Sequence, residues 1–356
     1  MTEVSNIPKA DTQTKTLTES GNLLEATDLR VTFRAPGGRK LHAVDTISIG
    51  VKPRETVGLV GESGSGKSTV ALTLMRAHEP ESGQIIFDGL DITHLSEREL
   101  LPIRRKLQVV FQDPYSSLDP RMSVRRIVAE PLKAHKYGNR SVINDRVDEL
   151  LEQVGLPPDA AQRLPAQFSG GQRQRIAIAR SLALEPMALI ADEPVSALDV
   201  SIQAQIVNLL RSLQDRLSIA FLVIAHDLAL VHQICDRIVV MYLGEAVEEG
   251  PADDVVGRPQ HPYTVALLSA TPVPVVGGDA ERILLTGDPP SPIHRPTGCR
   301  FHPRCPIAQE RCKTDKPPLV EFAPGRKVSC FYAGQMDPPR DLWAHEKEPL
   351  PDSPED

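Results

Sequence analysis

Residues 61–68 read Gly-Glu-Ser-Gly-Ser-Gly-Lys-Ser, and they constrain the fold more than any other stretch of the chain. They match the pattern G-x-x-x-x-G-K-[ST], a glycine-rich loop whose backbone N–H groups wrap nucleotide phosphates. The loop lies between the apolar run 56–60, which is typical of a buried strand, and residues 69–76, whose pattern is typical of a helix. The sequence therefore predicts an α/β domain that binds ATP or GTP.

Each position of this phosphate loop has a physical role. Glycines at 61, 64 and 66 permit positive φ and let the backbone approach an anion closely. We expect Lys67 to reach the β- and γ-phosphate oxygens and the hydroxyl of Ser68 to ligate Mg²⁺. The predicted nucleotide-binding residues are Gly61, Ser63, Gly64, Ser65, Gly66, Lys67, Ser68 and Thr69.

A second motif, about a hundred residues later, narrows the class. Residues 168–172 read Phe-Ser-Gly-Gly-Gln, which resembles the signature sequence of ATP-binding cassette (ABC) ATPases, with Phe where Leu is commoner. The other elements of that family follow in the family's order. They are the Q-loop glutamine Gln112, the acidic Walker B pair Asp192 and Glu193, the D-loop 196–199 with Asp199, and the switch histidine His226.

The resemblance implies catalytic roles for these residues. Asp192 is expected to hold Mg²⁺ together with Ser68 and Gln112. Glu193 is placed to polarise the attacking water as a general base, and His226 to hydrogen-bond the γ-phosphate. The catalytic set is therefore Glu193, His226 and Gln112.

The signature residues are expected to act on a second subunit. They begin a helix, whose free N–H groups and positive dipole end can bind phosphate. In this family that phosphate belongs to the ATP of the opposite subunit, so two subunits close head-to-tail around two ATPs. The residues are Ser169, Gly170, Gly171 and Gln172.

The wider pattern predicts a layered α/β architecture, because short Val/Ile/Leu runs alternate with helical patterns. The resemblance implies an ABC-type P-loop ATPase with a RecA-like core, an antiparallel β subdomain, a helical signature subdomain and a C-terminal accessory extension. Predicted antiparallel strands are 24–31 and 43–51. Predicted buried strands are 57–60, 109–111, 188–191, 220–224 and 238–242, and predicted helices are 124–135, 143–154 and 180–184.

Composition divides the chain into four parts: a flexible leader 1–22, the ABC ATPase domain 23–250, an extension 251–335 and an acidic tail 336–356. From Pro251 onward lie 19 of the 32 prolines, which predicts a compact extension with little regular structure. Residues 337–356 contain seven acids and two bases, so we expect a disordered tail.

Two further segments indicate which ABC ATPase this is. Residues 260–270 (Gln-His-Pro-Tyr-Thr-Val-Ala-Leu-Leu-Ser-Ala) and 298–308 resemble the C-terminal extension of oligopeptide/dipeptide/nickel importer ATPases. Residues 111–122 and 286–294 look most like the F-type member of the ATPase pair. The resemblance implies peptide import with a second ATPase, a paralogue, two permeases and an extracytoplasmic solute-binding protein. Nickel or another small solute remains an alternative cargo.

Composition excludes several other classes. The net charge of −7 and the aromatic content of 4% indicate no nucleic-acid-binding surface. No apolar run approaches about 18 residues, and the polar N-terminus is unlike a signal peptide. We therefore expect a cytoplasmic protein, and the resemblance implies a peripheral position on the cytoplasmic face of the membrane, held there by permeases. A soluble ABC ATPase is the other alternative, but a translation factor would carry two cassettes, and a DNA-repair ATPase a long coiled coil between Lys67 and Ser169.

Two further assignments start from the residues themselves. Four of the five cysteines cluster in the extension, where a cytoplasmic chain favours a metal site over disulfides. Their wide spacing suits a [4Fe–4S] cluster, with zinc, free thiols or a disulfide as alternatives. The proposed ligands are Cys299, Cys305, Cys312 and Cys330, whereas Cys235 is expected in the core. Phe33 is either the adenine-stacking aromatic residue or part of the core.

Overall fold

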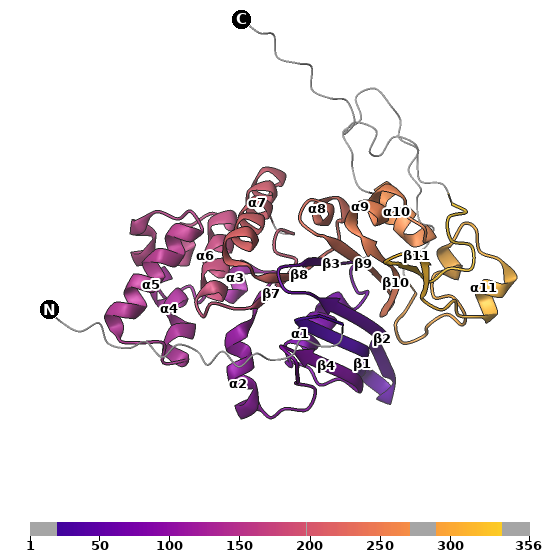
Figure 1. The fold of residues 1–356 in the computed structure, drawn as a ribbon, viewed down its shortest axis with the longest axis horizontal. Helices are drawn as coiled ribbons and strands as arrows, with labels where there is room; N and C mark the ends of the chain where they lie inside the picture. Colours follow the sequence, from indigo (N-terminus) through magenta and orange to yellow (C-terminus); the bar gives the residue numbers. More distant parts are fainter. Residues whose placement is uncertain (1–19, 197, 271–289, 337–356) are drawn as a thin grey trace, which may run out of the picture.

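The computed structural model describes residues 20–196, 198–270 and 290–336, and a central sheet runs through this part of the chain (Figure 1). Its strand order is β11-β12-β10-β9-β3-β8-β7-β6. The block from β9 to β6 is parallel, and the three strands beyond β9 are antiparallel. The strands are β3 (Thr56–Val60), β6 (Leu107–Val110), β7 (Ala188–Asp192), β8 (Ala220–Ala225), β9 (Arg237–Tyr242), β10 (Glu245–Pro251), β11 (Val320–Ala323) and β12 (Arg326–Val328).

Side chains of the parallel strands alternate between two hydrophobic cores. In β8, Phe221 and Val223 pack into the core shared with the helical region, and Leu222 and Ile224 pack into the core beneath the smaller sheet. Successive residues of a strand point to opposite faces, so a strand buried on both faces must be apolar throughout. The five predicted core strands are confirmed within one or two residues for this reason.

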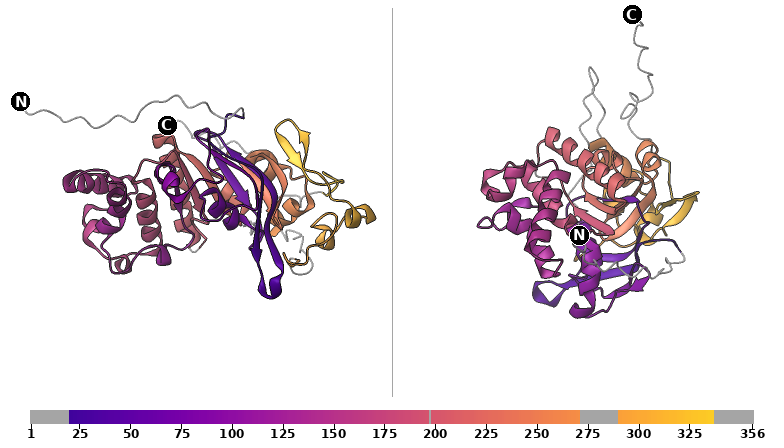
Figure 2. Two further views of the ribbon diagram at one scale, coloured as in Figure 1. Left: turned by 90° about the horizontal axis from the view of Figure 1, so that it is seen from below. Right: turned by 60° about the vertical axis from the view of Figure 1, so that its left-hand side comes forward.

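A smaller antiparallel sheet, ordered β2-β1-β4-β5, covers one face of the central sheet. Helix α1 (Lys67–Leu74) contacts strands of both sheets. In the left view of Figure 2, β1 and β2 form a long hairpin between the helical region and the extension. Both strands are longer than predicted, and residues 35–39 form the turn between them. The strands are β1 (Leu24–Arg34), β2 (Lys40–Val51), β4 (Ser82–Phe87) and β5 (Leu90–Asp91).

The helical region lies at the opposite end of the molecule from the extension (Figure 1). Its helices are α3 (Pro114–Ser117), α4 (Val124–Ala134), α5 (Arg140–Gln153) and α6 (Gly170–Leu182), whereas α2 (Glu97–Lys106) packs against the core beneath the smaller sheet. Asn139 caps α5 by accepting a hydrogen bond from the N–H of Val142. Residues 180–182 of the helix predicted at 180–184 are helical, but they are the end of α6, which runs unbroken from the signature.

The remaining helices surround the other end of the central sheet. They are α7 (Val200–Leu217), α8 (Leu228–His232), α9 (Ala252–Gly257), α10 (Pro262–Ala270) and α11 (Glu310–Thr314), with the 3-10 turn η4 (His302–Arg304). The extension thus has short regular elements, two of which extend the central sheet through the pairing of β12 with β10. Its proline content did not predict this pairing.

A buried carboxylate joins the extension to the sheet. Glu248 of β10 is fully buried and accepts the backbone N–H groups of Gln260 and His261, each at 2.9 Å. It also pairs with the guanidinium of Arg326 in β12 at 2.8 Å. Each carboxylate oxygen therefore has a partner, which is the condition for burying a charge.

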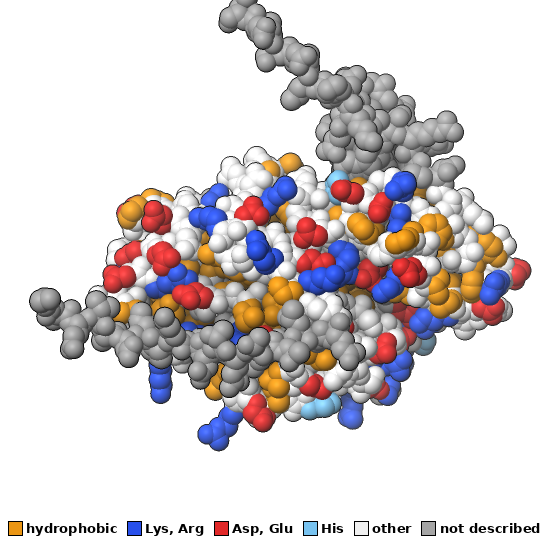
Figure 3. Space-filling model, viewed as in Figure 1, with side chains coloured by type: hydrophobic (Ala, Val, Ile, Leu, Met, Phe, Trp, Pro, Cys, Tyr) orange, Lys and Arg blue, Asp and Glu red, His pale blue; other side chains and the backbone are white. Residues whose placement is uncertain are grey.

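Charged side chains of both signs are interspersed on the face shown in Figure 3. Arg104 of α2 pairs with Glu97 at 2.6 Å, and Arg125 of α4 pairs with Asp148 at 2.5 Å. Within the described ranges, none of the helices is long and apolar enough to cross a membrane. The predicted leader up to residue 19 and the predicted acidic tail beyond 336 lie outside the described residues, as does part of the 286–294 motif.

Candidate nucleotide site

The phosphate loop connects β3 to α1, and close contacts with neighbouring backbone leave no room for a side chain at two of its glycines. A Cβ on Gly61 would stand 2.1 Å from the carbonyl oxygen of Met241 in β9. Gly66 has φ +103°, and a Cβ there would stand 2.2 Å from the carbonyl oxygen of Ala43 in β2. Because the loop is pressed against both sheets, its path from β3 into the first turn of α1 is fixed. Free N–H groups of that turn make an anion site.

Lys67 is buried within this loop. Its ammonium donates hydrogen bonds to the carbonyl oxygens of Gly61 at 2.7 Å and of Glu62 at 2.9 Å. Burial lowers the pKa of Lys67, and the carboxylates of Glu193 and Asp192 oppose that effect. The charge therefore lies at the centre of the loop, beside the acidic pair.

The predicted Mg²⁺ ligands of the two motifs meet. The Ser68 hydroxyl donates to Oδ1 of Asp192 at 3.1 Å, although the two residues are 124 positions apart. Asp192 ends β7 and is 8% exposed. Burial raises the pKa of Asp192, and the neighbouring charge of Glu193 acts in the same direction. A divalent cation bound by Ser68 and Asp192 would favour the ionised carboxylate.

Glu193 is held by the other two predicted catalytic residues. Gln112, which follows β6, donates from Nε2 to Oε2 of Glu193 at 2.8 Å. His226, which follows β8, places Nδ1 3.6 Å from the same oxygen. Glu193 itself has φ +45°, a left-handed backbone that is costly for a residue with a Cβ. The carboxyl ends of three adjacent parallel strands thus bring the three side chains together.

Gln112, Glu193 and the phosphate loop line a cavity of about 440 Å³. It has the volume of a typical small-molecule site. Phe33 lines one wall and also packs against the core, so both readings of this residue describe its position. Its ring meets His78 edge-on at 5.2 Å. The described lining residues are Phe33, Leu41, Ala43, Ser63, Gly64, Gly66, Lys67, Ser68, Thr69, Gln112, Glu193 and Pro292.

The signature residues lie elsewhere, at the N-terminus of α6. Ser169 is the N-cap, with its hydroxyl accepting the N–H of Gln172, and the Gln172 side chain accepts the N–H of Ser169. Gly171 allows close packing on α7, since a Cβ would stand 2.4 Å from Ile202. In the described part of the chain, no signature residue lines the cavity around Lys67. Asp199, the N-cap of α7, is also exposed.

Sequence reasoning missed three residues that touch the phosphate loop or line its cavity. Arg304 in η4 pairs with both carboxylate oxygens of Glu62, at 2.7 and 3.1 Å. The hydroxyl of Tyr263 in α10 accepts the backbone N–H of Glu62 at 2.8 Å. Pro292 lines the nucleotide cavity. A charged residue at the second position of the motif was the only local signal, since its partners lie more than 200 positions away.

A larger groove, about 640 Å³, lies beside α7 and α8. It is lined by charges of both signs, among them Arg54, Arg211 and Asp215, and by none of the phosphate-loop residues. The nucleotide chemistry therefore belongs to the smaller cavity.

The four cysteines of the extension line one small cavity, of about 10 Å³, with His261 and His302. Burial raises the pKa of Cys305 to about 12 and that of Cys330 to about 11. The free thiols are therefore protonated at neutral pH, whereas a metal ligand must be a thiolate. In the described ranges, no three His, Cys, Asp or Glu side chains are placed to hold a metal ion. The structure thus gathers the predicted thiols but gives no support for the predicted [4Fe–4S] cluster or zinc. Cys235 is buried in the core, as expected.

Known proteins resemble the chain in both parts. The family model described as ABC transporter matches residues 44–196, and the one described as oligopeptide/dipeptide transporter, C-terminal region, matches residues 247–312. A peptide import ATP-binding protein of Brucella ovis is 52% identical over 291 residues, which span 82% of this chain and 92% of the relative. The oligopeptide transport ATP-binding protein AppF of Bacillus subtilis is 48% identical over 317 residues, spanning 86% and 96%.

Solved structures match the cassette. The ATP-binding cassette MJ0796, in a dimeric post-hydrolysis state bound to ADP and Pi, is 31% identical with a TM-score of 0.59 over 64% of this chain and 98% of that one. CbiO1 of Clostridium perfringens, part of the complex cbiONQ, is 30% identical with a TM-score of 0.60 over 67% and 91%. With relatives this similar over nine-tenths of their length, the chain belongs to the ABC transporter ATPases, in the oligopeptide/dipeptide transporter family.

Proposed function

We propose that this chain hydrolyses ATP to power the import of peptides through a membrane ABC transporter. One observation carries the proposal: the phosphate loop, the Ser68–Asp192 pair and Glu193 with its two partners converge on one cavity. The relatives named for oligopeptide transport supply the cargo class. Nickel or another small solute is the alternative cargo, and nothing in the site favours it.

The residues divide the chemistry among them. ATP places its phosphates against the loop N–H groups, and Lys67 leaves its two loop carbonyls for the β/γ oxygens. Ser68, Asp192 and Gln112 are suited to hold Mg²⁺, which neutralises charge on the phosphates. Glu193 takes a proton from the attacking water, and His226 contacts the γ-phosphate.

The signature supports a composite site. Ser169, Gly170, Gly171 and Gln172 begin a helix of thirteen residues, long enough to present an anion-binding end. In a head-to-tail dimer this end contacts ATP bound to the partner, which in our proposal is a paralogous ATPase, with this chain as the F-type member of the pair. Asp199 in the D-loop faces the same interface. ATP binding closes the dimer and hydrolysis resets it.

The assembly has two permeases, which the Q-loop around Gln112 contacts, and an extracytoplasmic solute-binding protein. The chain is then peripheral, at the cytoplasmic face. We propose the cassette at 23–250 as the motor and the extension at 251–335 as an accessory part. Phe33, on the cavity wall, is proposed to stack on the adenine base.

The cysteine cavity is proposed to take a metal staple. Four thiol groups around one space support this, because a cation would repay the cost of ionising buried thiols. A single zinc ion is close in size to the cavity, which admits about one water-sized sphere, whereas a cluster requires the cavity to widen. Anaerobically purified protein tests this: about four irons per chain supports the cluster, one zinc supports the ion, and neither metal refutes the staple.

Membrane fractionation tests the function. An affinity tag on this chain should recover two permeases and a second ATPase from detergent-solubilised membranes, and added peptide should raise ATP hydrolysis by that complex. A soluble pool bound to ribosomes or DNA, with no permeases, would contradict the importer proposal.

A further inference from the structure

The C-terminal extension reaches into the phosphate loop itself. The side chain of Arg304 is only 6% exposed, and its guanidinium forms a bidentate ion pair with the Glu62 carboxylate, at N···O distances of 2.7 and 3.1 Å. Glu62 is the first variable residue of the motif, directly after Gly61. A planar guanidinium facing a carboxylate with two parallel hydrogen bonds fixes orientation as well as charge.

A second contact fixes the backbone of the same residue. The Tyr263 hydroxyl, from α10, accepts the N–H of Glu62 at 2.8 Å. Burial raises the pKa of Tyr263, so the phenol is neutral at physiological pH. The ring is fully buried, with centroid distances of 4.6 Å to Tyr242 and 5.4 Å to Phe301. Phe301 directly precedes η4 and Arg304 ends it. Contacts at these two residues therefore hold both ends of this short segment.

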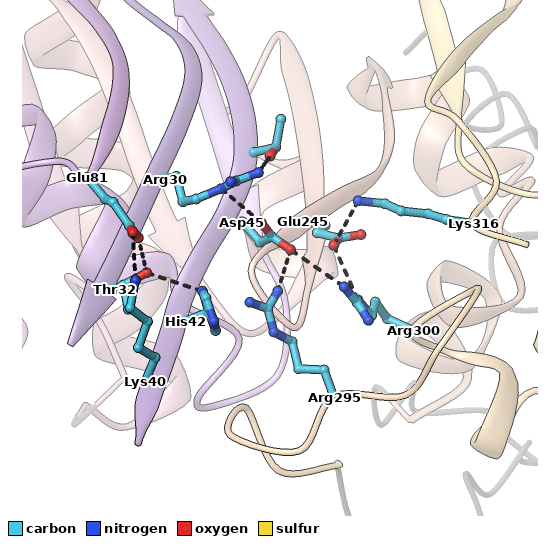
Figure 4. A network of polar contacts seen from close by, with 11 residues as sticks. Arg30, Thr32, Lys40, His42, Asp45, Glu81, Glu245, Arg295, Arg300 and Lys316 are labelled. Carbon is cyan, nitrogen blue, oxygen red and sulfur yellow. Dashed lines mark hydrogen bonds and ion pairs between the residues drawn. The ribbon is translucent and has the colours of Figure 1, made fainter. Parts of the chain in front are cut away.

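The extension also contributes to the wall of the cavity. Pro292 is one of the lining residues, together with Leu41 and Ala43 of β2. In Figure 4, Arg295 and Arg300 of the extension converge on Asp45 of β2, and Arg300 and Lys316 meet Glu245 of β10. The carbonyl of Ala43 is the one that Gly66 approaches, so these ion pairs hold the strand against which the loop rests.

The chemistry of the loop explains why Glu62 needs a partner. A nucleoside triphosphate brings several negative charges to this loop, and an unpaired carboxylate at the second position of the loop would repel them. The Glu62 carboxylate also interacts electrostatically with Lys67, the cation intended for the phosphates. Pairing with Arg304 neutralises the Glu62 carboxylate, so this carboxylate no longer competes with the phosphates for Lys67.

We propose that Arg304 is a positioning residue for ATP binding, through which the extension forms part of the nucleotide site of its own chain. The inference rests on the proposed function, because it assumes that the loop binds ATP. Arg304 never touches the nucleotide; it neutralises Glu62 and, with Tyr263, holds the start of the loop. The neighbouring residue, Cys305, lines the cysteine cavity.

Binding of a non-hydrolysable ATP analogue with Mg²⁺ to the purified full-length chain tests this by calorimetry. Arg304→Ala should weaken binding about tenfold, because it leaves a partly buried carboxylate unpaired beside the phosphates. Glu62→Gln should bind within about twofold of wild type. The double variant Arg304→Ala/Glu62→Gln should recover to the level of Glu62→Gln. A merely structural arginine would not be rescued by removing a charge.

The matched control is Arg258→Ala, which removes an exposed arginine of the extension that pairs with Asp254 at 2.9 Å and should leave affinity unchanged. If Arg304→Ala does not purify folded, Arg304→Lys keeps the charge without the two-pronged geometry and should lose about threefold. Wild-type affinity in Arg304→Ala, or a double variant as weak as Arg304→Ala, overturns the inference. A wild-type chain that binds no nucleotide refutes the proposed function instead.

Discussion

Asp192 and Glu193 are adjacent carboxylates with different surroundings, and the difference separates their proposed tasks. Asp192 is buried and bonded to Ser68, the other proposed Mg²⁺ ligand. Glu193, the next residue, has a left-handed backbone conformation, and its carboxylate accepts a hydrogen bond from the side-chain amide of Gln112. Two acids in unlike environments at one site are typical of a division between metal binding and proton transfer.

Glu193→Gln should therefore abolish turnover while preserving binding. The amide cannot accept a proton, so ATP hydrolysis by the assembled transporter should fall about a hundredfold or more. Binding should persist, since Lys67, Ser68 and Asp192 remain. Turnover and ATP affinity measured on the same preparation check this, with the partner ATPase inactivated equally.

Lys67→Ala provides the contrast. Removing a cation that serves the β/γ oxygens should weaken ATP binding by about ten- to a hundredfold. Near-normal hydrolysis by Glu193→Gln would reassign the base, and unchanged affinity in Lys67→Ala would remove the proposed role of that ammonium.

At this scale the sequence predicted the motif residues and missed their partners. Gly61, Lys67 and Ser68 follow from a local pattern with a known backbone geometry. The pair formed by Arg304 and Glu62 spans 242 positions. No periodicity or spacing connects such residues, because only the folded chain brings them together.

Elements of secondary structure show a similar division. The core strands are continuous apolar runs, so their pattern is strong. Strand β12 has three residues, and β5 has two, which leaves no periodicity to detect. Their existence depends on pairing with distant strands, as β12 pairs with β10.

Glu248 should matter more to the extension than any exposed charge there. Glu248→Gln leaves the Arg326 guanidinium buried without a counter-charge and gives up an acceptor for one backbone N–H, which should cost about 3–5 kcal/mol of folding free energy. Denaturant unfolding checks the value. Lys327→Ala, on the half-exposed neighbouring side chain, is the control and should change it by less than about 1 kcal/mol. Equal effects of both variants would contradict the account of this anchor.

Across the whole molecule, the signature and the phosphate loop serve different nucleotides in our proposal. The signature helix α6 begins in the helical region (Figure 1), whereas the cavity is lined by residues of β1, β2 and the phosphate loop. One chain then supplies two halves of two different sites. The solved cassette MJ0796 is itself described as dimeric with ADP and Pi bound.

Variants of this chain in complex with its paralogous partner test this arrangement. Glu193→Gln blocks the site that holds the ATP of this chain, and Ser169→Arg blocks the site that holds the ATP of the partner. Each single variant should therefore keep up to about half of the activity per dimer, and the double variant Glu193→Gln/Ser169→Arg should lose nearly all of it. Hydrolysis by the wild type should rise faster than linearly at low concentration. Linear activity of a monomer, or full activity of the Ser169→Arg complex, would contradict composite sites.

The measurement that tests the central claim most directly is peptide accumulation in proteoliposomes. These contain this chain, its partner ATPase and the two permeases, and the solute-binding protein is supplied on the side of the membrane opposite to this chain. The account predicts uptake that requires ATP and Mg²⁺ on the side of this chain and is lost with Glu193→Gln. Uptake that persists without ATP, or that is unaffected by Glu193→Gln in this chain and the matching change in its partner, would contradict it.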